Sequence, residues 1–85
     1  MASYSLRVKR SAEHELRSVP KPDLARLVHR IQALVSNPRP PGAEKLSGED
    51  AYRIRQGDWR VIYAIDDDAK LIEIIKIGHR REVYR

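Results

Sequence analysis

The sequence predicts an α+β fold in which two N-terminal helices pack on a small, mainly antiparallel four-stranded sheet, in the order β-α-α-β-β-β. Three observations support it: a long segment with helical spacing of apolar residues, three apolar runs in the C-terminal half, and a two-residue turn between the first two runs. The chain has 85 residues, enough for one small domain, so we expect residues 1–85 to fold as a single unit.

The first strand and the first helix are predicted from short patterns. The strand alternates apolar and polar residues, and its apolar positions are Tyr4, Leu6 and Val8. The helix is expected to begin at Ser11, whose hydroxyl suits an N-cap, and to end before Pro20. Its apolar residues share one face and are Ala12, Leu16 and Val19.

The second helix has the most regular pattern in the chain. Its apolar residues recur with helical spacing and are Leu24, Leu27, Val28, Ile31, Leu34 and Val35. Pro22 suits the first helical turn, and the carboxylate of Asp23 complements the positive end of the helix dipole. The helix is expected to end at Asn37 and Pro38. Residues 38–50 are rich in proline and glycine, so we expect an irregular linker there, without helix or strand.

The three apolar runs at residues 52–56, 59–65 and 71–77 are predicted to form an antiparallel meander. Gly57 and Asp58 separate the first two runs, which is typical of a tight hairpin. The sequence leaves open where the N-terminal strand joins this sheet.

A two-residue turn at Gly57 and Asp58 decides which side chains of the hairpin share a face. It places Arg55 opposite Arg60, and strand alternation brings Arg53 to the same side; we call these three residues the arginine face. The other side is apolar and should be covered by the helices; it consists of Tyr52, Ile54, Trp59, Val61, Tyr63 and Ile65. Neighbouring arginines with no acid among them on these strands repel one another. The arginine face is therefore either a solvated strand surface or a phosphate-binding platform.

The composition limits the partners and cofactors that we expect. The net charge of +5 favours a polyanionic partner such as nucleic acid. The chain has no cysteine, and the run Asp66 to Asp68 is better explained as a solvated turn than as a metal site, so we expect neither a metal nor another cofactor. No apolar run is long enough to span a membrane and the N-terminus lacks a signal-peptide core. We therefore expect a cytoplasmic protein with no membrane partner.

The last eight residues supply groups for proton transfer. Residues 78–85 carry arginines, His79 and Tyr84, directly after the strand that should return to the level of Arg60. This set suits cleavage of RNA through its own 2′-hydroxyl, because arginines can hold the charge of the phosphorane. A tyrosine among cations has its anionic form favoured and is a candidate base, while His79 is a candidate acid. DNA lacks the 2′-hydroxyl, so this mechanism acts on RNA alone.

At this point the chain resembles the RelE toxins of bacterial and archaeal toxin–antitoxin pairs. The matching segments are residues 45–48, 52–55, 57–67 and 78–85. The resemblance implies a metal-independent endoribonuclease that cuts messenger RNA in the decoding site of the ribosome. It also implies a cognate RelB-type antitoxin as partner, in a heterotetramer or larger toxin–antitoxin complex.

The resemblance further implies roles for single residues. The catalytic set is Arg53, Arg55 and Arg60, which stabilise the phosphorane, with Arg80 at the leaving group and Tyr84 as base or orienter of the 2′-hydroxyl. Further contacts with RNA are expected from Lys45, His79, Arg81 and Arg85. The best-studied pattern has lysines where this chain has Arg53 and Arg55, so positive charge is kept, but an arginine cannot shift its pKa as a lysine can.

Three alternative functions fit the same pattern. The first is a ParE-like inhibitor of DNA gyrase, which shares the fold but typically lacks the full catalytic set. The second is an RNA- or ribosome-binding module without catalysis, and the third is a protein that only binds its antitoxin. The arginine face together with Arg80 and Tyr84 favours the nuclease over these alternatives.

Overall fold

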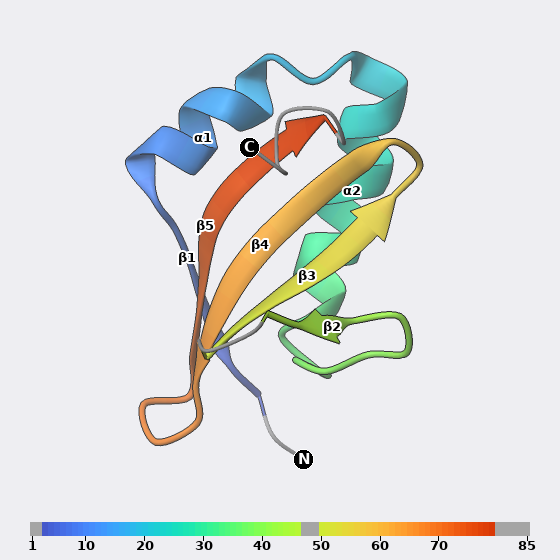
Figure 1. Cartoon of the computed structure of the whole chain (residues 1–85). Helices are drawn as coiled ribbons and strands as arrows, with labels where there is room; N and C mark the ends of the chain where they lie inside the picture. The colour runs from blue at the N-terminus through green and yellow to red at the C-terminus, as the bar shows by residue number, and fades with distance from the viewer. Residues whose placement is uncertain (1–2, 47–49, 80–85) are drawn as a thin grey trace.

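The computed structural model describes residues 3–46 and 50–79, and it confirms the predicted α+β class. Two helices pack against one sheet whose strand order is β1-β5-β4-β3-β2 (Figure 1). The helices are α1 (Arg10–Arg17) and α2 (Lys21–Ala33). The strands are β1 (Ser5–Val8), β2 (Glu44–Lys45), β3 (Ala51–Gln56), β4 (Trp59–Asp66) and β5 (Leu71–His79).

The sheet has five strands, so the predicted number of four is wrong by one short strand, β2. Residues 38–50 were expected to be irregular, yet Glu44 pairs with Arg53 and Lys45 pairs with Tyr52. The prolines that indicated a linker all precede this strand. A strand of two residues is also too short to show an alternating pattern, which is why the sequence did not reveal it.

The N-terminal strand joins the far edge of the sheet, where β1 runs parallel to β5. Ser5 lies opposite Leu71 and Val8 lies opposite Ile74. A parallel pair needs a crossover connection, which both helices and the hairpin supply here. The remaining strand pairs are antiparallel, so the prediction of a mainly antiparallel sheet is confirmed.

The two helices cover one face of the sheet, with α1 beside β5 and α2 behind β3 and β4 in the view of Figure 1. The predicted N-cap at Ser11 is wrong, because α1 begins at Arg10 and Lys9 occupies the cap position without a side-chain hydrogen bond. Pro22 lies in the first turn of α2, as predicted. The predicted helix end at Asn37 and Pro38 is wrong, because α2 ends at Ala33 and the backbone N–H groups of residues 34–36 bond to the third residue back instead of the fourth. The buried core contains Tyr4, Ala12, Val19, Leu27, Ile31, Leu34, Ile54, Val61, Tyr63, Ile65, Ile72, Ile74 and Ile77.

The hairpin of β3 and β4 has the predicted register, with Arg55 opposite Arg60. Gly57 has a φ of 62°, whereas Asp58 is not among the residues with positive φ. Positive φ at the first central residue alone is the pattern of a type II′ turn, whose twist matches that of the flanking strands. The apolar side of the hairpin faces the helices as predicted. Tyr63 is fully buried there, while Trp59 remains partly exposed.

An irregularity between β4 and β5 keeps the apolar residues of β5 on the core side. Ile62 lies opposite Lys76 and Tyr63 lies opposite Ile74, so Ile75 has no partner in β4. Strict alternation would turn Ile77 away from the side of Ile74. The additional residue restores the phase, and Ile74 and Ile77 are both buried.

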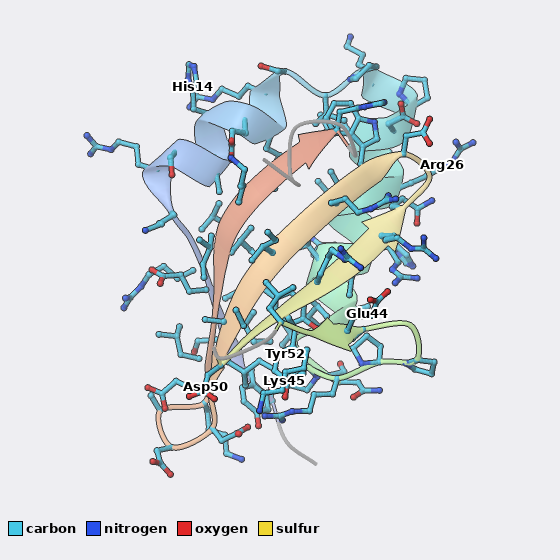
Figure 2. All side chains as sticks on the ribbon, in the orientation of Figure 1. His14, Arg26, Glu44, Lys45, Asp50 and Tyr52 are labelled. Atoms are coloured by element: carbon cyan, nitrogen blue, oxygen red, sulfur yellow. The ribbon has the colours of Figure 1, made fainter. Side chains whose placement is uncertain are left out.

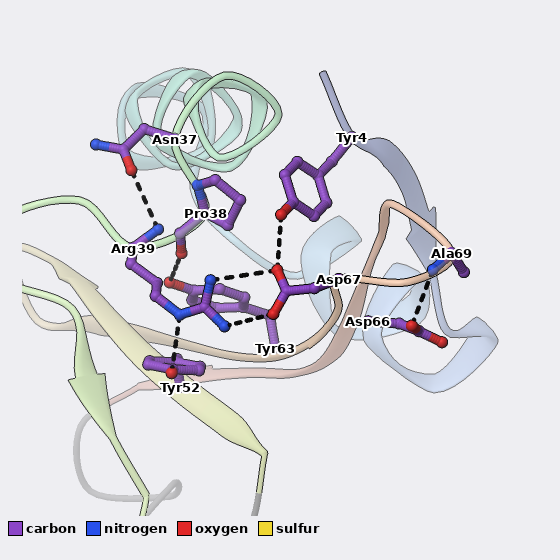
Figure 3. Close-up of polar contacts among 9 residues, drawn as sticks. All are labelled: Tyr4, Asn37, Pro38, Arg39, Tyr52, Tyr63, Asp66, Asp67 and Ala69. Atoms are coloured by element: carbon purple, nitrogen blue, oxygen red, sulfur yellow. Dashed lines mark hydrogen bonds and ion pairs between the residues drawn. The ribbon is translucent and has the colours of Figure 1, made fainter. Parts of the chain in front are cut away.

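The segment that leads into β2 is anchored by a polar cluster around Arg39 and Asp67 (Figure 3). Arg39 forms a bidentate ion pair with Asp67, with Nη2–Oδ2 and Nη1–Oδ1 distances of 2.9 Å and 3.3 Å. The Nε of Arg39 donates to the hydroxyl of Tyr52 at 3.0 Å, and the hydroxyl of Tyr4 donates to Asp67 at 2.6 Å. The turn expected at Asp66 to Asp68 is present, and Asp67 also joins Tyr4, which precedes β1, to Arg39 in the loop before β2. Arg39 in turn contacts Tyr52 of β3.

The core contributes a second anchor for the same loop. The hydroxyl of Tyr63 is buried and donates to the carbonyl oxygen of Pro38 at 2.7 Å. Burial raises the pKa of Tyr63 to about 12, so the hydroxyl stays protonated and keeps donating across the physiological range.

The edge of β5 beyond the end of β1 is covered by a side chain of α1. The last backbone contact between the two strands is the donation of Lys9 N to the carbonyl oxygen of Ile74 at 3.0 Å. Further along, the carboxylate of Glu15 accepts from the backbone N–H of Ile77 at 3.0 Å and lies 3.5 Å from Lys76 Nζ. A backbone donor that β1 does not reach is therefore satisfied by Glu15.

We expect Gly57→Ala to lower the free energy of unfolding by about 1–2 kcal/mol, because an L-residue is strained at positive φ. Nothing lies within 4 Å of the position that a Cβ would take, so the loss is conformational and not steric. Urea unfolding monitored by circular dichroism measures it. Gly57→Asn is the matched variant and should lose less, because asparagine tolerates positive φ. Equal losses in the two variants would contradict the turn assignment.

We expect the difference in stability between the wild type and Asp67→Asn to depend on pH. The hydrogen bonds from Arg39 and Tyr4 lower the pKa of Asp67 to about 2. A carboxyl group with a lowered pKa stabilises the fold above its ordinary pKa, so this contribution is present above about pH 4 and is lost as the pH falls towards 2. Urea midpoints at pH 6, 4 and 2 test this. Asp68→Asn is the control and should show no such trend; a constant difference for Asp67→Asn down to pH 2 would refute the role of the ion pair.

Candidate functional site

The arginine face lies at the end of the sheet where β3 and β4 meet in their turn. Arg60 has Arg55 opposite it on β3 and Gly78 opposite it on β5. The prediction that the last strand returns to the level of Arg60 is therefore confirmed. Since Gly78 has no side chain, the space across from the guanidinium on the β5 side is not filled by this partner. The chain leaves β5 at His79, which pairs with Trp59 next to the turn.

Arg60 is the most deeply buried charged residue of the described chain, with 7% of its surface exposed. Its Nη1 donates to the backbone carbonyl oxygens of Gly57 and Trp59, at 3.2 Å and 3.3 Å. Its Nε is also buried and has no hydrogen-bond partner among residues 3–46 and 50–79. A buried N–H without an acceptor costs about 1–3 kcal/mol. The turn that orders the hairpin thus also orients a guanidinium whose donors are only partly satisfied.

Arg53 is held by Glu44, an acid that no pattern in the sequence places beside it. Its Nη2 lies 2.7 Å from Glu44 Oε2, and 14% of the Arg53 side chain is exposed. The expectation that no acid lies among these arginines holds for β3 and β4 but not for the sheet, because β2 adds Glu44. Only a prediction of β2 would have revealed this contact. The ion pair orients Arg53 and offsets part of the repulsion on the arginine face.

Arg55 differs from the other two arginines because it is exposed. It lines a cavity of about 460 Å³ at the edge of β3, together with Arg30, Pro41, Gly42 and Gly57. The three arginines therefore have unequal surroundings: Arg60 is buried, Arg53 is ion-paired and Arg55 is open to solvent.

His79 lies with Trp59 and not with Arg60. The rings of Trp59 and His79 meet edge to face with centroids 5.6 Å apart, and Trp59 Nε1 donates to Asp23 at 3.3 Å. His79 Nε2 is 4.0 Å from Asp58 Oδ2. Because Trp59 belongs to the apolar side of the hairpin, strand alternation places His79 on the opposite side of the sheet from Arg60. A phosphate held at Arg60 is therefore on the other side of the sheet from the His79 side chain.

Lys45 lies at the other end of the sheet from the turn. It pairs with Tyr52 and lines a cavity of about 580 Å³ together with Arg39, Asp50 and Asp67. Figure 2 shows Lys45, Asp50 and Tyr52 gathered at this end, while Arg26 of α2 lies near the turn. The structure therefore does not bring Lys45 next to Arg60.

The remaining predicted site residues lie outside the described residues; they are Arg80, Arg81, Tyr84 and Arg85. Within the described parts of the chain, no group of three or more histidine, aspartate or glutamate side chains is arranged to hold a metal ion. None of the described helices is both long and apolar enough to cross a membrane.

We expect Arg60→Met to raise the free energy of unfolding of the isolated chain by about 1 kcal/mol, because it removes a buried, partly unsatisfied cation next to Arg55. Urea unfolding in phosphate-free buffer measures the change. Arg55→Met is the matched variant and should stay within about 0.5 kcal/mol of the wild type, because Arg55 is exposed. A lower free energy of unfolding in Arg60→Met would contradict this expectation, because it would show that Arg60 stabilises the fold.

Comparisons with known proteins agree with this architecture. Residues 6–84 match the family described as the ParE toxin of the type II toxin–antitoxin system ParDE. The chain is 33% identical to Toxin RelE of Mycobacterium tuberculosis over 84 residues, which cover 96% of this chain and 87% of that protein. It is 29% identical to Putative toxin RelE1 of Methanocaldococcus jannaschii, over 96% of both chains.

Solved structures show the same fold. The toxin–antitoxin complex RelBE2 of Mycobacterium tuberculosis contains a chain that superposes with a TM-score of 0.82 at 27% identity, over 96% of this chain and 97% of that chain. The archaeal RelE–RelB complex of Pyrococcus horikoshii gives a TM-score of 0.80 at 29% identity, over 94% and 98% of the two chains.

Proposed function

The chain belongs to the RelE/ParE family of type II toxin–antitoxin toxins, and we propose that it is an endoribonuclease that cuts messenger RNA on the ribosome. The observation that carries this proposal is the buried guanidinium of Arg60, whose Nε has no acceptor among the described residues. Such a group is a preorganised donor for an anion. Arg53 and Arg55 share its face of the hairpin, and the tail that carries Arg80 and Tyr84 starts next to it.

In the proposed reaction the 2′-hydroxyl of the RNA attacks the adjacent phosphodiester. Tyr84 takes the proton of the 2′-hydroxyl or orients it, and Arg80 acts at the leaving 5′-oxygen. Arg60 and Arg53 stabilise the phosphorane, because charge-assisted hydrogen bonds from fixed donors are strongest where water is excluded. Arg60 is fixed by two carbonyl oxygens and Arg53 by Glu44, so both are oriented before the substrate arrives.

The same arginines take the role that a metal ion has in many other nucleases, so the proposed reaction needs no metal. An arginine keeps its charge throughout the physiological range, and its planar fork matches two phosphate oxygens at once. The side chain of Arg55 is exposed to solvent, so it is accessible for a contact with the RNA backbone. The other proposed contacts with RNA come from residues further from Arg60 or from the C-terminal tail. They are Lys45, His79, Arg81 and Arg85.

We propose a RelB-type antitoxin as the natural partner. The two similar toxins of known structure cited above were solved in complexes with RelB-type proteins. The net charge of +5 favours an acidic partner segment, which would cover the arginine face and so block RNA. We expect the complex to be a heterotetramer or larger and to form in the cytoplasm.

One alternative function, inhibition of DNA gyrase, is supported by a specific observation. The family that matches residues 6–84 is described as the ParE toxin. A gyrase inhibitor would act by binding, and it would not need the partly unsatisfied donor of Arg60.

Translation in vitro with purified ribosomes tests the proposal. We expect cuts within codons of the translated messenger RNA, mapped by primer extension. Arg60→Ala should slow cleavage by about 100-fold or more, because removing a donor to the transition state has that effect in other enzymes. Tyr84→Phe should also lose activity. Arg7→Gln, an exposed change on the distant edge strand β1, is the control and should keep it.

Three results would contradict the proposal. Intact messenger RNA together with inhibited DNA supercoiling by gyrase would favour the alternative. Cleavage of free RNA at the same rate without ribosomes would exclude the ribosome-dependent form. Full activity in Arg60→Ala would remove the central role of the buried guanidinium.

A further inference from the structure

A second basic feature lies beside the arginine face, at the edge of β3. The cavity of about 460 Å³ there is lined by residues from three separate parts of the chain. These are Arg30 of α2, Pro41 and Gly42 of the loop before β2, and Arg55 and Gly57 of the hairpin. No acidic residue among those that the structure describes lines it. The segments meet only because α2 packs behind β3 and the Arg39–Asp67 ion pair anchors the loop.

The two arginines of this cavity have no anion within the described chain. The ion pairs of residues 3–46 and 50–79 use other cations, and neither Arg30 nor Arg55 forms a side-chain hydrogen bond there. Arg30 is partly buried, so water does not fully screen its charge. Two cations that line one cavity are unfavourable when it is empty and favourable once an anion lies between them.

The backbone at this edge adds a donor of its own. Ala51 directs its carbonyl oxygen towards the β2 side of the sheet, where it accepts from Leu46 N at 2.8 Å. In an antiparallel strand every second residue points its backbone groups to the same side, so Arg55 also directs its N–H outward. The pairing of β2 with β3 stops at Arg53, and β2 therefore does not reach the N–H of Arg55.

The walls of the cavity leave room for close approach. Gly42 has a φ of 91° and Gly57 a φ of 62°, and a Cβ at either position would have no atom within 4 Å. Both glycines are required by the backbone and also keep the cavity free of side chains. A tetrahedral oxyanion can thus reach the guanidinium groups and the outward N–H of Arg55.

Arg55 connects this cavity with the proposed cleavage site. It lies directly opposite Arg60 in a pair that does not share backbone hydrogen bonds, the closer of the two antiparallel geometries. An RNA strand with one phosphate at Arg60 therefore meets Arg55 next, and it reaches Arg30 of α2 by passing around the edge of β3. A positively charged groove that follows the backbone is a common way of binding single-stranded RNA.

We propose that the Arg30–Arg55 cavity binds a phosphate of the same RNA strand that flanks the phosphate held at Arg60. This inference rests on the proposed function, because it takes the substrate to be single-stranded RNA. It assigns Arg30, a helix residue outside the predicted site, as a binding residue that sets the path of the strand.

Binding of 2′-O-methyl RNA, which cannot be cleaved through its 2′-hydroxyl, tests the proposal without relying on catalysis. Fluorescence anisotropy with the full chain compares a labelled hexanucleotide with a labelled dinucleotide over a range of salt concentrations. We expect Arg30→Gln to weaken binding of the hexanucleotide about 5- to 10-fold and to reduce the magnitude of its salt slope by about 0.7, as for the loss of one phosphate contact to a single strand. The dinucleotide, with a single phosphodiester, should bind as before.

Arg26→Gln is the matched control, because Arg26 is exposed on the same helix, near the turn, but does not line the cavity (Figure 2). It should leave both affinities and both slopes nearly unchanged, while Arg30→Lys should recover part of the loss. Thermal melting checks that each variant is folded. Equal losses in Arg26→Gln and Arg30→Gln would show a diffuse charge effect and overturn the proposal, as would an unchanged salt slope in Arg30→Gln.

The outcomes separate this inference from the proposed function. If the slope changes as expected but no messenger RNA is cut on ribosomes, the cavity stands as an RNA site and the nuclease proposal fails. If messenger RNA is cut but Arg30→Gln binds the hexanucleotide like the wild type, the nuclease stands and the cavity proposal fails.

Discussion

The register of the β3–β4 hairpin is the constraint on which the rest of the structure depends. A turn of two residues, with Gly57 at positive φ, leaves one way to pair the strands. That pairing sends Ile54 and Val61 into the core and sets Arg55 opposite Arg60. A slip by one residue would exchange the two faces of a strand, which would expose the core and bury the arginines. Stability of the fold and placement of the site therefore have one cause.

A second level of organisation comes from contacts between residues far apart in sequence. The Arg39–Asp67 ion pair and the hydrogen bond from Tyr63 to Pro38 hold the loop that leads into β2. Glu44 of β2 then orients Arg53, and the same loop forms a wall of the cavity at Arg30. Polar contacts at one end of the sheet thus shape the basic surface at its other end, through a loop that has little regular structure.

Local patterns were predictable from the sequence because their causes are local. The periodicity of α2, the hairpin turn and the apolar side of β3 and β4 depend on residues within a few positions of one another, and all are confirmed. The strand β2, the parallel position of β1 and the unpaired Ile75 depend on distant partners, and the sequence did not reveal them. For the site, alternation predicted the shared face of the arginines, whereas the contact with Glu44 and the position of Arg30 required the fold.

The outer strands β1 and β2 each cover only part of the neighbouring strand, and this has a consequence for self-association. At β5 the carboxylate of Glu15 occupies the backbone N–H of Ile77, so that edge cannot accept another strand there. Among the described residues, no strand other than β2 and β4 pairs with β3. A fibril that grows by strand addition needs two open edges on every copy, one for each neighbour. Glu15 therefore removes one of the places at which a second copy could add a strand, while the outer sides of β1 and β2 remain the ends of the sheet.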